Sequence, residues 1–444
     1  MFSVHQHWDP LKVCAVGRSY PPEFYSYIKD ARVRNVFEKI AIETEEDYQK
    51  LISKLEEFNV EVVRTDIADN LDVYIQEQNS IPPPPMTPRD FTAMVGSTFH
   101  MPGEQYANDI DPDRELRRML QHDSLTDTFY RLKNNPELAE YIFDIFLPGR
   151  AVDLKPSSIL ALKGKFEKVD SLNKLINVIS TDNLKELIIQ SKTNTIGSNN
   201  KFPNFKKFYA FESIRNRLLE EGNEVVHNTY INSANMIRLG KDLYFNLANI
   251  INYLEKDEIR ERYQKLFPGY RTHPLTIPGH GDGSVCPVKP GLIVTVRDPD
   301  KYKETFPGWE VVPLKGQSWF AVEPHLKNKS KLRNRYFVQG EENNDAFHDY
   351  ITEWYDHWVT YVEETVFDVN MLVIDEKNVI CNNENDQVFE AFERHGITPH
   401  VVNFRHRYFW DGGLHCITSD LHREGTRKDY FPDRELGYDY SIST

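Results

Sequence analysis

A histidine and a cysteine stand directly behind two glycines near the C-terminal end of the chain. The stretch Asp411–Asp420 reads DGGLHCITSD, with His415 and Cys416 side by side. A cysteine thiolate is a strong nucleophile, and glycines leave room for a substrate to approach the backbone. A buried cysteine at the end of a strand has the same appearance in a sequence. Taken alone, the stretch leaves a nucleophile and a structural cysteine both open.

A second stretch combines a histidine with a carboxylate. Residues Pro278–Gly283 read PGHGDG, so His280 and Asp282 are two positions apart. On an extended chain both side chains point the same way, and a histidine beside a carboxylate is a usual acid–base unit. A flexible turn with solvated side chains is the alternative. Arg89–Asp90, which follows a proline-rich connector at 81–85, is by itself only a surface ion-pair candidate.

The histidines near the C-terminus raise the question of a metal site. None of them has the spacing of a paired metal-binding motif, so we predict neither a metal ion nor a cofactor. The net charge of −15 argues against a nucleic-acid partner, because phosphate contacts need clustered Lys and Arg. The cluster comprises His395, His400, His406, His415 and His422.

The length of 444 residues allows two domains, or one large domain built from repeats with an insertion. The start of the chain has no readable secretory signal, and no run of 18 apolar residues indicates a membrane span. The four cysteines form no C-x-x-C pair, which favours free thiols in a reducing cytoplasm. We therefore predict a cytoplasmic protein.

One structural unit recurs along the chain: a helical pattern, a short turn, and a β-branched strand. In the first copy Leu51, Ile52, Leu55 and Phe58 share one helical face, and a valine-rich strand follows. Gly222 ends the helix of the second copy. The copies occupy residues 45–66, 212–229, 258–277, 301–314 and 386–404, and further apolar runs occur at 13–17, 91–96, 243–247, 292–296 and 370–375. The pattern predicts a five-fold repeat of αβ modules that bury a shared core.

Residues 105–207 interrupt the repeat with about 100 residues of mostly helical pattern and a polar, turn-rich end. We predict a repeat-built domain at 1–104 and 208–444 and a helical insertion at 105–207. The insertion is either a surface element packed on the core, or a lid or an oligomer contact. A homodimer is therefore an open alternative.

Several stretches, taken in order, resemble the glycine amidinotransferases of the arginine:glycine type. The resemblance covers roughly residues 1–100 and 205–430. DGGLHCITSDLHREG resembles the family's G-G-x-H-C-x-T segment, and GHGDG resembles its H-x-D. The remaining matches are HQHWDPLKVCAVGR (5–18), MTPRD (86–90), NSANMIRLGKDLYF (232–245) and VNMLVIDEKNVI (369–380).

The resemblance implies the pentein fold, an α/β propeller with pseudo-five-fold symmetry and a central active site. It also implies a nucleophilic cysteine that takes the amidino group from arginine and passes it to an amine. On this basis Cys416 is the nucleophile, His280 the acid–base group, and Asp90 and Asp282 the carboxylates that hold a guanidinium. The full predicted set is Cys416, His280 and Asn232 as catalytic residues, and Asp90, Asp282, Lys301, Arg89 and His415 as substrate-binding residues.

The sequence departs from the family pattern at three places. Two family aspartates fall on Asn232 and Asn235, and an amide can neither neutralise a cation nor take a proton. An arginine that anchors a substrate carboxylate falls on Lys301, which lacks the planar fork. The family's serines before N-V-L align poorly, near Glu363 and Glu364.

We predict an amidinotransferase whose partners are small molecules, an arginine-like donor and an amine acceptor. One alternative is a hydrolase of the same fold, in which water replaces the amine and citrulline replaces ornithine as product. Another is a non-catalytic binding protein of this fold, which Asn232 favours and the Cys, His and Asp set opposes.

Overall fold

The computed structural model describes most of the repeat-built part of the chain. The described residues are 1–67, 83–101, 210–227, 231, 233–246, 256–277, 280–296, 302–314, 338–351, 355, 367–434 and 440–443. The predicted helical insertion at 105–207 lies outside them, and so do Asn232 and Lys301. In the described segments, no helix combines the length and the apolar character that a membrane crossing requires.

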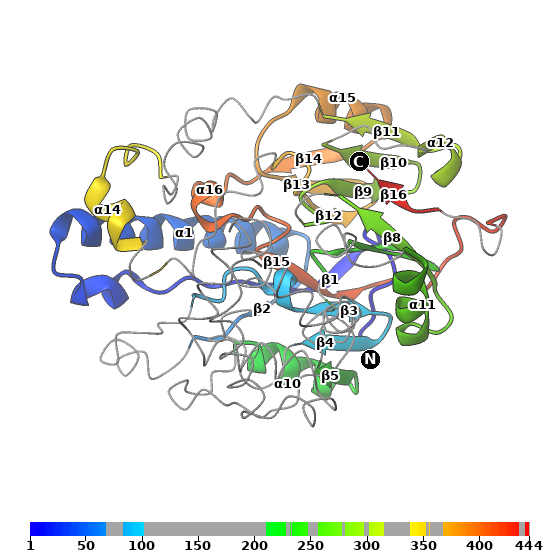
Figure 1. The fold of residues 1–444 in the computed structure, drawn as a ribbon, viewed down its shortest axis with the longest axis horizontal. Coiled ribbons are helices and arrows are strands. Elements are labelled where there is room, and N and C mark those ends of the chain that lie inside the picture. Colours follow the sequence, from blue (N-terminus) through cyan, green and yellow to red (C-terminus); the bar gives the residue numbers. More distant parts are fainter. Residues whose placement is uncertain are drawn as a thin grey trace, which may run out of the picture.

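The described strands form five small sheets, and each sheet has the same internal order. In every sheet the middle strand pairs antiparallel with one neighbour and parallel with the other, and a helix precedes the parallel neighbour along the chain. Figure 1 shows the sheets gathered on one side and the long helix α1 (Ala31–Glu57) extending away from them. The repeat of αβ modules predicted from the sequence is therefore present.

Four modules follow the chain order hairpin, helix, strand, and in the first of them residues 102–211 separate the hairpin from the helix. The sheet that contains β6, β7 and β8 has a fourth strand, β16 (Ile442–Ser443), which pairs parallel with β8 (Arg271–Thr276). The modules are β3 (Ala93–Val95), β4 (Thr98–Met101), α10 (Glu212–Glu220), β5 (Glu224–His227); β6 (Met236–Leu239), β7 (Asp242–Asn246), α11 (Lys256–Leu266), β8 (Arg271–Thr276); β9 (Val285–Lys289), β10 (Leu292–Thr295), α12 (Tyr302–Thr305), β11 (Glu310–Pro313); and β12 (Leu372–Asp375), β13 (Asn378–Cys381), α15 (Asp386–Arg394), β14 (Thr398–Val401).

The remaining module is assembled from both ends of the chain. Strand β1 (Leu11–Val16) is the middle strand, with β2 (Glu61–Arg64) parallel on one side and β15 (Thr418–Arg423) antiparallel on the other. Val16 pairs with Thr418 and Cys14 with Asp420. This pairing fixes the start of β15, and with it Cys416, beside the end of β1 (Figure 1).

Each of the five module helices, α1, α10, α11, α12 and α15, ends in a turn that contains one residue with positive φ, after which the chain enters the parallel strand. Gly222, predicted as a helix stop, has φ of 78°, a conformation that glycine adopts without strain. Asn59 takes this position in the first module with φ of 57°. The corresponding residues elsewhere are Gly269, Gly308 and Gly396.

Gly17 allows close packing of the segment that leads to Arg89 and Asp90. A Cβ atom at Gly17, just after β1, would collide with the backbone carbonyl of Met86. The amide of Gly17 donates to the carbonyl of Ile417 at 2.9 Å, so the same residue also touches the segment that follows Cys416. The missing side chain at Gly17 lets the Met86 backbone pack directly against the end of β1.

Candidate active site

The candidate site is built from the segments that immediately precede the first strand of each module. These segments are 87–92 before β3, 233–235 before β6, 280–284 before β9, 367–371 before β12 and 411–417 before β15. Backbone hydrogen bonds link them: Asp282 N–H donates to Ala234 O at 2.9 Å and Ala234 N–H donates to Arg89 O at 3.2 Å. The five-fold repeat therefore brings five distant parts of the chain to one place.

Cys416 lies in a tight turn between the short helix α16 (Arg407–Trp410) and β15, and its side chain is 1% exposed. The turn is closed by hydrogen bonds from Ile417 N–H to Gly413 O at 3.0 Å and from the Thr418 hydroxyl to Leu414 O at 2.8 Å. These bonds hold the Cys416 backbone at the start of a strand whose opposite end is fixed in the core.

Asn370, immediately before β12, holds this turn from the side. Its Oδ1 accepts from the backbone N–H groups of His415 at 2.9 Å and Cys416 at 3.3 Å. Its Nδ2 donates to Cys416 Sγ at 3.0 Å. A Cβ atom at Gly413 would lie 2.6 Å from Asn370 Oδ1, so this glycine makes room for the Asn370 amide and not for the substrate predicted from the sequence.

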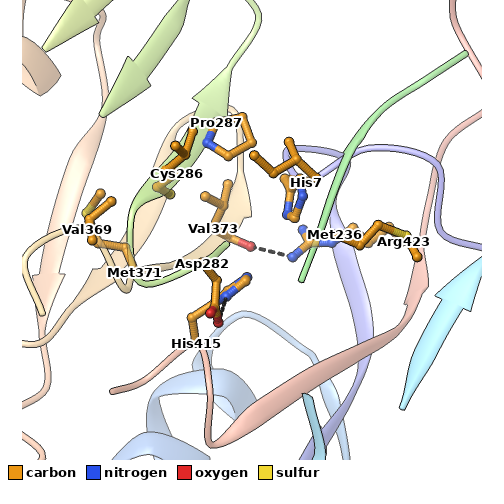
Figure 2. A pocket seen from close by; sticks show the side chains of 12 residues that line it. His7, Met236, Asp282, Cys286, Pro287, Val369, Met371, Val373, His415 and Arg423 are labelled. Atoms are coloured by element: carbon orange, nitrogen blue, oxygen red, sulfur yellow. Dashed lines mark hydrogen bonds and ion pairs between the residues drawn. The ribbon is translucent and has the colours of Figure 1, made fainter. Parts of the chain in front are cut away.

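Asp282 connects the cysteine to its neighbouring histidine. The Nδ1–H of His415 donates to Asp282 Oδ2 at 2.8 Å, and the same oxygen lies 3.4 Å from Cys416 Sγ. Figure 2 shows the pair close together, from two different elements. Residues 282–284 form a turn, which was the alternative left open by the sequence, but Asp282 is buried in it and points towards His415.

Burial controls the protonation of this pair. Burial, followed by the positive charge of Arg89, lowers the pKa of His415 to about 4, although Asp282 acts in the opposite direction. Burial alone would raise the pKa of Asp282, but the hydrogen bond and charge of His415, together with the charges of His280 and Arg89, lower it. At neutral pH the site therefore contains a neutral imidazole that donates to an ionised carboxylate.

His280 and Asp90 form a second histidine–carboxylate pair, closer to the solvent. His280 Nδ1 lies 3.7 Å from Asp90 Oδ1, and the two side chains are 25% and 20% exposed. Asp90 belongs to the single helical turn α3 (Pro88–Phe91), which begins with a proline and is closed by Thr92 N–H donating to Pro88 O at 2.9 Å. This pair can exchange protons with a ligand or with solvent more readily than the buried pair.

Arg89 lies beneath the cysteine turn and is fully buried. Its Nε donates to the carbonyls of His415 at 2.7 Å and Thr418 at 2.8 Å, and its guanidinium pairs with Asp420 at 3.0 Å. The reading of Arg89 as a surface ion-pair residue is therefore wrong. Its contacts hold the carbonyls on either side of Cys416.

Asp420 is surrounded by three buried arginines. Arg238 donates to both of its oxygens at 2.8 and 2.7 Å, and Arg423 lies 2.9 Å away, in addition to Arg89. Burial alone would raise the pKa of Asp420, but the three guanidinium charges hold it well below its usual value. Sequence reasoning missed this cluster; the available signal was the charged residues within otherwise apolar strand patterns, which need buried partners.

A small pocket adjoins the buried pair on the side of His7 (Figure 2). Its free space of about 10 Å³ has room for roughly one water molecule. It is therefore too small for a guanidinium-bearing substrate, and we do not assign the donor to it. Its lining includes His7, Met236, Asp282, Cys286, Met371 and His415.

The other three cysteines lie within strands, Cys14 in β1, Cys286 in β9 and Cys381 in β13. Burial raises the pKa of Cys14 and Cys286 to about 12 and also raises that of Cys381. All four cysteines are free. Of the remaining predicted site residues, Asn232 and Lys301 lie outside the described residues, and their roles stay predictions.

The chain is similar in sequence to amidinotransferases. It is 25% identical over 231 residues to the mitochondrial glycine amidinotransferase of Gallus gallus, a stretch covering 50% of this chain and 46% of the relative. It is 24% identical over 203 residues to the L-arginine:L-lysine amidinotransferase of Pseudomonas savastanoi pv. phaseolicola, covering 45% and 46%. The chain spans about half the length of the curated relatives it matches. No protein-family model matches the chain.

The fold is shared with a solved amidinotransferase structure. The inosamine-phosphate amidinotransferase of Streptomyces griseus superimposes with a TM-score of 0.50 at 14% identity, covering 97% of this chain and 99% of that one. With the five sheets described above, this likeness establishes the pentein fold. The resemblance to amidinotransferases expected from the sequence motifs is confirmed by the curated relatives.

Proposed function

We propose that the protein transfers an amidino group from arginine, or a related guanidino donor, to an amine through a covalent intermediate on Cys416. The observation that carries the proposal is the position of the Cys416 sulfur, 3.4 Å from a carboxylate oxygen of Asp282. A nucleophilic sulfur beside a buried carboxylate suits a cationic electrophile, because the carboxylate attracts the cation to the sulfur. The sequence relatives named amidinotransferases support the same reaction class.

The two carboxylates account for donor binding. A guanidinium is planar and has five N–H donors, so it binds best to carboxylates in its own plane. Asp282 Oδ1 is buried and has no hydrogen-bond partner within the described part of the chain. Asp90 lies on the more exposed side, beside His280. A bound guanidinium would satisfy Asp282 Oδ1 and favour ionisation of the neighbouring thiol.

The reaction proceeds in two steps, formation and breakdown of the covalent intermediate. In the first, Cys416 Sγ bonds to the guanidinium carbon, the bond from that carbon to the side-chain nitrogen breaks, and ornithine leaves after that nitrogen gains a proton. In the second, an amine attacks the amidino carbon, the carbon–sulfur bond breaks and its electron pair returns to sulfur, and the amine loses a proton. One acid–base group can serve both proton transfers.

His280 is the acid–base group in this proposal, and His415 supports it from the buried side. His280 is one quarter exposed and has a carboxylate partner, so it can exchange protons with substrate and solvent. His415 is buried, and its low pKa keeps it neutral. We assign His415 to orienting Asp282, Arg89 to holding the cysteine turn, and Lys301 to a substrate carboxylate.

Incubation with arginine, followed by intact mass spectrometry, tests the proposal. A mass increase equal to one amidino group on the wild type, absent from Cys416→Ala, is the expected result. Release of ornithine together with a new guanidino compound supports transfer, whereas citrulline would indicate the hydrolase alternative. Absence of both adduct and turnover with guanidino donors would refute the proposal. The cytoplasmic location, which free thiols support, and a homodimer remain predictions.

A further inference from the structure

Asn370, which lies in the matching stretch 369–380 but was given no role there, contacts the cysteine directly. Its side chain is fully buried, and it makes three hydrogen bonds to the cysteine turn, at the backbone N–H groups of His415 and Cys416 and at the sulfur itself. The two backbone donors must face the amide oxygen, because N–H groups cannot accept. The NH₂ group of Asn370 must consequently face Cys416 Sγ.

The surroundings keep the Asn370 amide in this orientation. Its backbone carbonyl accepts from Asn382 Nδ2 at 2.7 Å, and the Oδ1 of Asn382 accepts from Leu414 N–H at 3.1 Å. Gly413 has no side chain at the point where a Cβ atom would lie 2.6 Å from Asn370 Oδ1. The amide is therefore fixed before any substrate binds.

We infer that Asn370 is a further catalytic residue, whose side-chain NH₂ holds the Cys416 sulfur in the attacking position and stabilises its thiolate. This inference rests on the proposed role of Cys416 as nucleophile. Asp282 and Asn370 act on the sulfur in opposite senses: the carboxylate opposes a negative charge there and the amide donor favours it. Asn370 thereby supports a thiolate in a site that also needs a carboxylate for the cationic donor.

The test measures the reactivity of the Cys416 sulfur in the absence of substrate. The full-length protein is treated with iodoacetamide over a pH series, and the alkylation rate of the Cys416 peptide is followed by mass spectrometry. Asn370→Ala should raise the apparent pKa of alkylation by about one unit, which is about a tenfold slower reaction below that pKa. Asn383→Ala is the matched control, because the Asn383 amide donates to Asp368 and not to the Cys416 sulfur. The alkylation profile of this variant should match that of the wild type.

The variant Asn370→Asp distinguishes two possible roles of Asn370, stabilising the Cys416 thiolate and supporting the backbone of the turn. An aspartate still accepts from the two backbone N–H groups, but it places a carboxylate where the donor was. We expect a larger upward shift than in Asn370→Ala, whereas a purely structural role predicts the wild-type profile. Folded Asn370→Asp protein with an unchanged profile would overturn the inference.

Gly413→Ala provides a second variant should Asn370→Ala fail to fold. The added methyl group displaces the Asn370 amide from the sulfur, so the apparent pKa should again rise. The alkylation rate is measured without substrate, so it does not depend on whether the protein transfers amidino groups. If the alkylation profile depends on Asn370 but arginine leaves no amidino adduct, the transfer reaction is refuted and the role of Asn370 is retained. If the adduct forms but the profile does not depend on Asn370, only the role of Asn370 is refuted.

Discussion

Nδ1 of His415 lies 2.8 Å from Oδ2 of Asp282, which makes the two residues a buried hydrogen-bonded pair at the centre of the molecule. The pair directs one carboxylate oxygen towards His415 and the Cys416 sulfur and leaves Oδ1 without a partner among the described residues. Because His415 stays neutral, it orients Asp282 without cancelling its charge. The carboxylate therefore remains available to a cationic ligand.

The first prediction concerns the two carboxylates. Asp282→Asn should weaken donor binding by about 2–5 kcal/mol, because a cation would meet an amide at a desolvated position, and Asp90→Asn should weaken it less, because the Asp90 side chain is 20% exposed. Isothermal titration of arginine into Cys416→Ala protein that carries each substitution measures this loss without turnover. Wild-type affinity in both variants would place these aspartates outside the donor site.

The second prediction concerns the other cysteines. Cys14, Cys286 and Cys381 are buried with raised thiol pKa values, so they should be unreactive at neutral pH. Single replacements by alanine should leave kcat for amidino transfer within about twofold of the wild type, and Cys416→Ala should abolish it. Steady-state assays of the four variants provide the comparison; lost turnover in a folded Cys14→Ala or Cys381→Ala protein would contradict it.

The third prediction separates the two histidines. His280→Ala should lower kcat by at least about 10²-fold, because both proton transfers lose their acid–base group. Its circular dichroism and melting temperature should change little, since the His280 side chain is one quarter exposed. His415→Ala, which removes a buried partner of Asp282, should lower the melting temperature as well as kcat. Equal kcat in His280→Ala and wild type would remove His280 from the mechanism.

Much of the fold could be predicted from the sequence, because each module contains a helical pattern followed by a β-branched strand. All five predicted helix–strand units are present. The antiparallel partners of the predicted strands, β4, β6, β9, β13 and β15, were not predicted. β6 contains a buried arginine, Arg238, and β9 contains a proline in its interior, and both residues weaken a strand pattern in the sequence.

The site was less predictable, because its contacts join distant segments. His415 and Asp282 are 133 positions apart, and Asn370 is 46 positions from Cys416. No local spacing indicates such contacts. The motifs identified which residues could react, whereas their mutual arrangement depends on the five modules converging at the segments before their first strands.

The fourth prediction concerns stability at acidic pH. Burial lowers the pKa of His100 to about 4, below its usual value near 6.5. Between these pH values the unfolded chain binds a proton that the folded chain does not, so the free energy of unfolding falls as pH falls. The shift corresponds to about 3 kcal/mol lost between about pH 6.5 and pH 4.

His100→Gln should reduce this loss, because glutamine does not titrate. Urea denaturation at pH 7 and pH 4.5 measures it in both proteins. His422→Gln is a suitable control, since His422 is partly exposed. An equal pH dependence in His100→Gln and wild type would contradict the prediction.

The last prediction concerns Asn232, where the resembling family has an aspartate. Its neighbours Ile231 and Ser233 are buried, and Ser233 N–H donates to Thr92 O at 2.9 Å, so the segment adjoins the turn that carries Asp90. If arginine is the donor, Asn232→Asp restores a carboxylate for a cationic transition state with little change in shape. We expect kcat/KM for arginine to rise by about 10²-fold, or roughly 2.7 kcal/mol. Steady-state kinetics of the wild type and Asn232→Asp provide the measurement. A fall in kcat/KM and in melting temperature would mean that the added charge is unpaired, and the search for the donor would turn to uncharged amidino or ureido compounds.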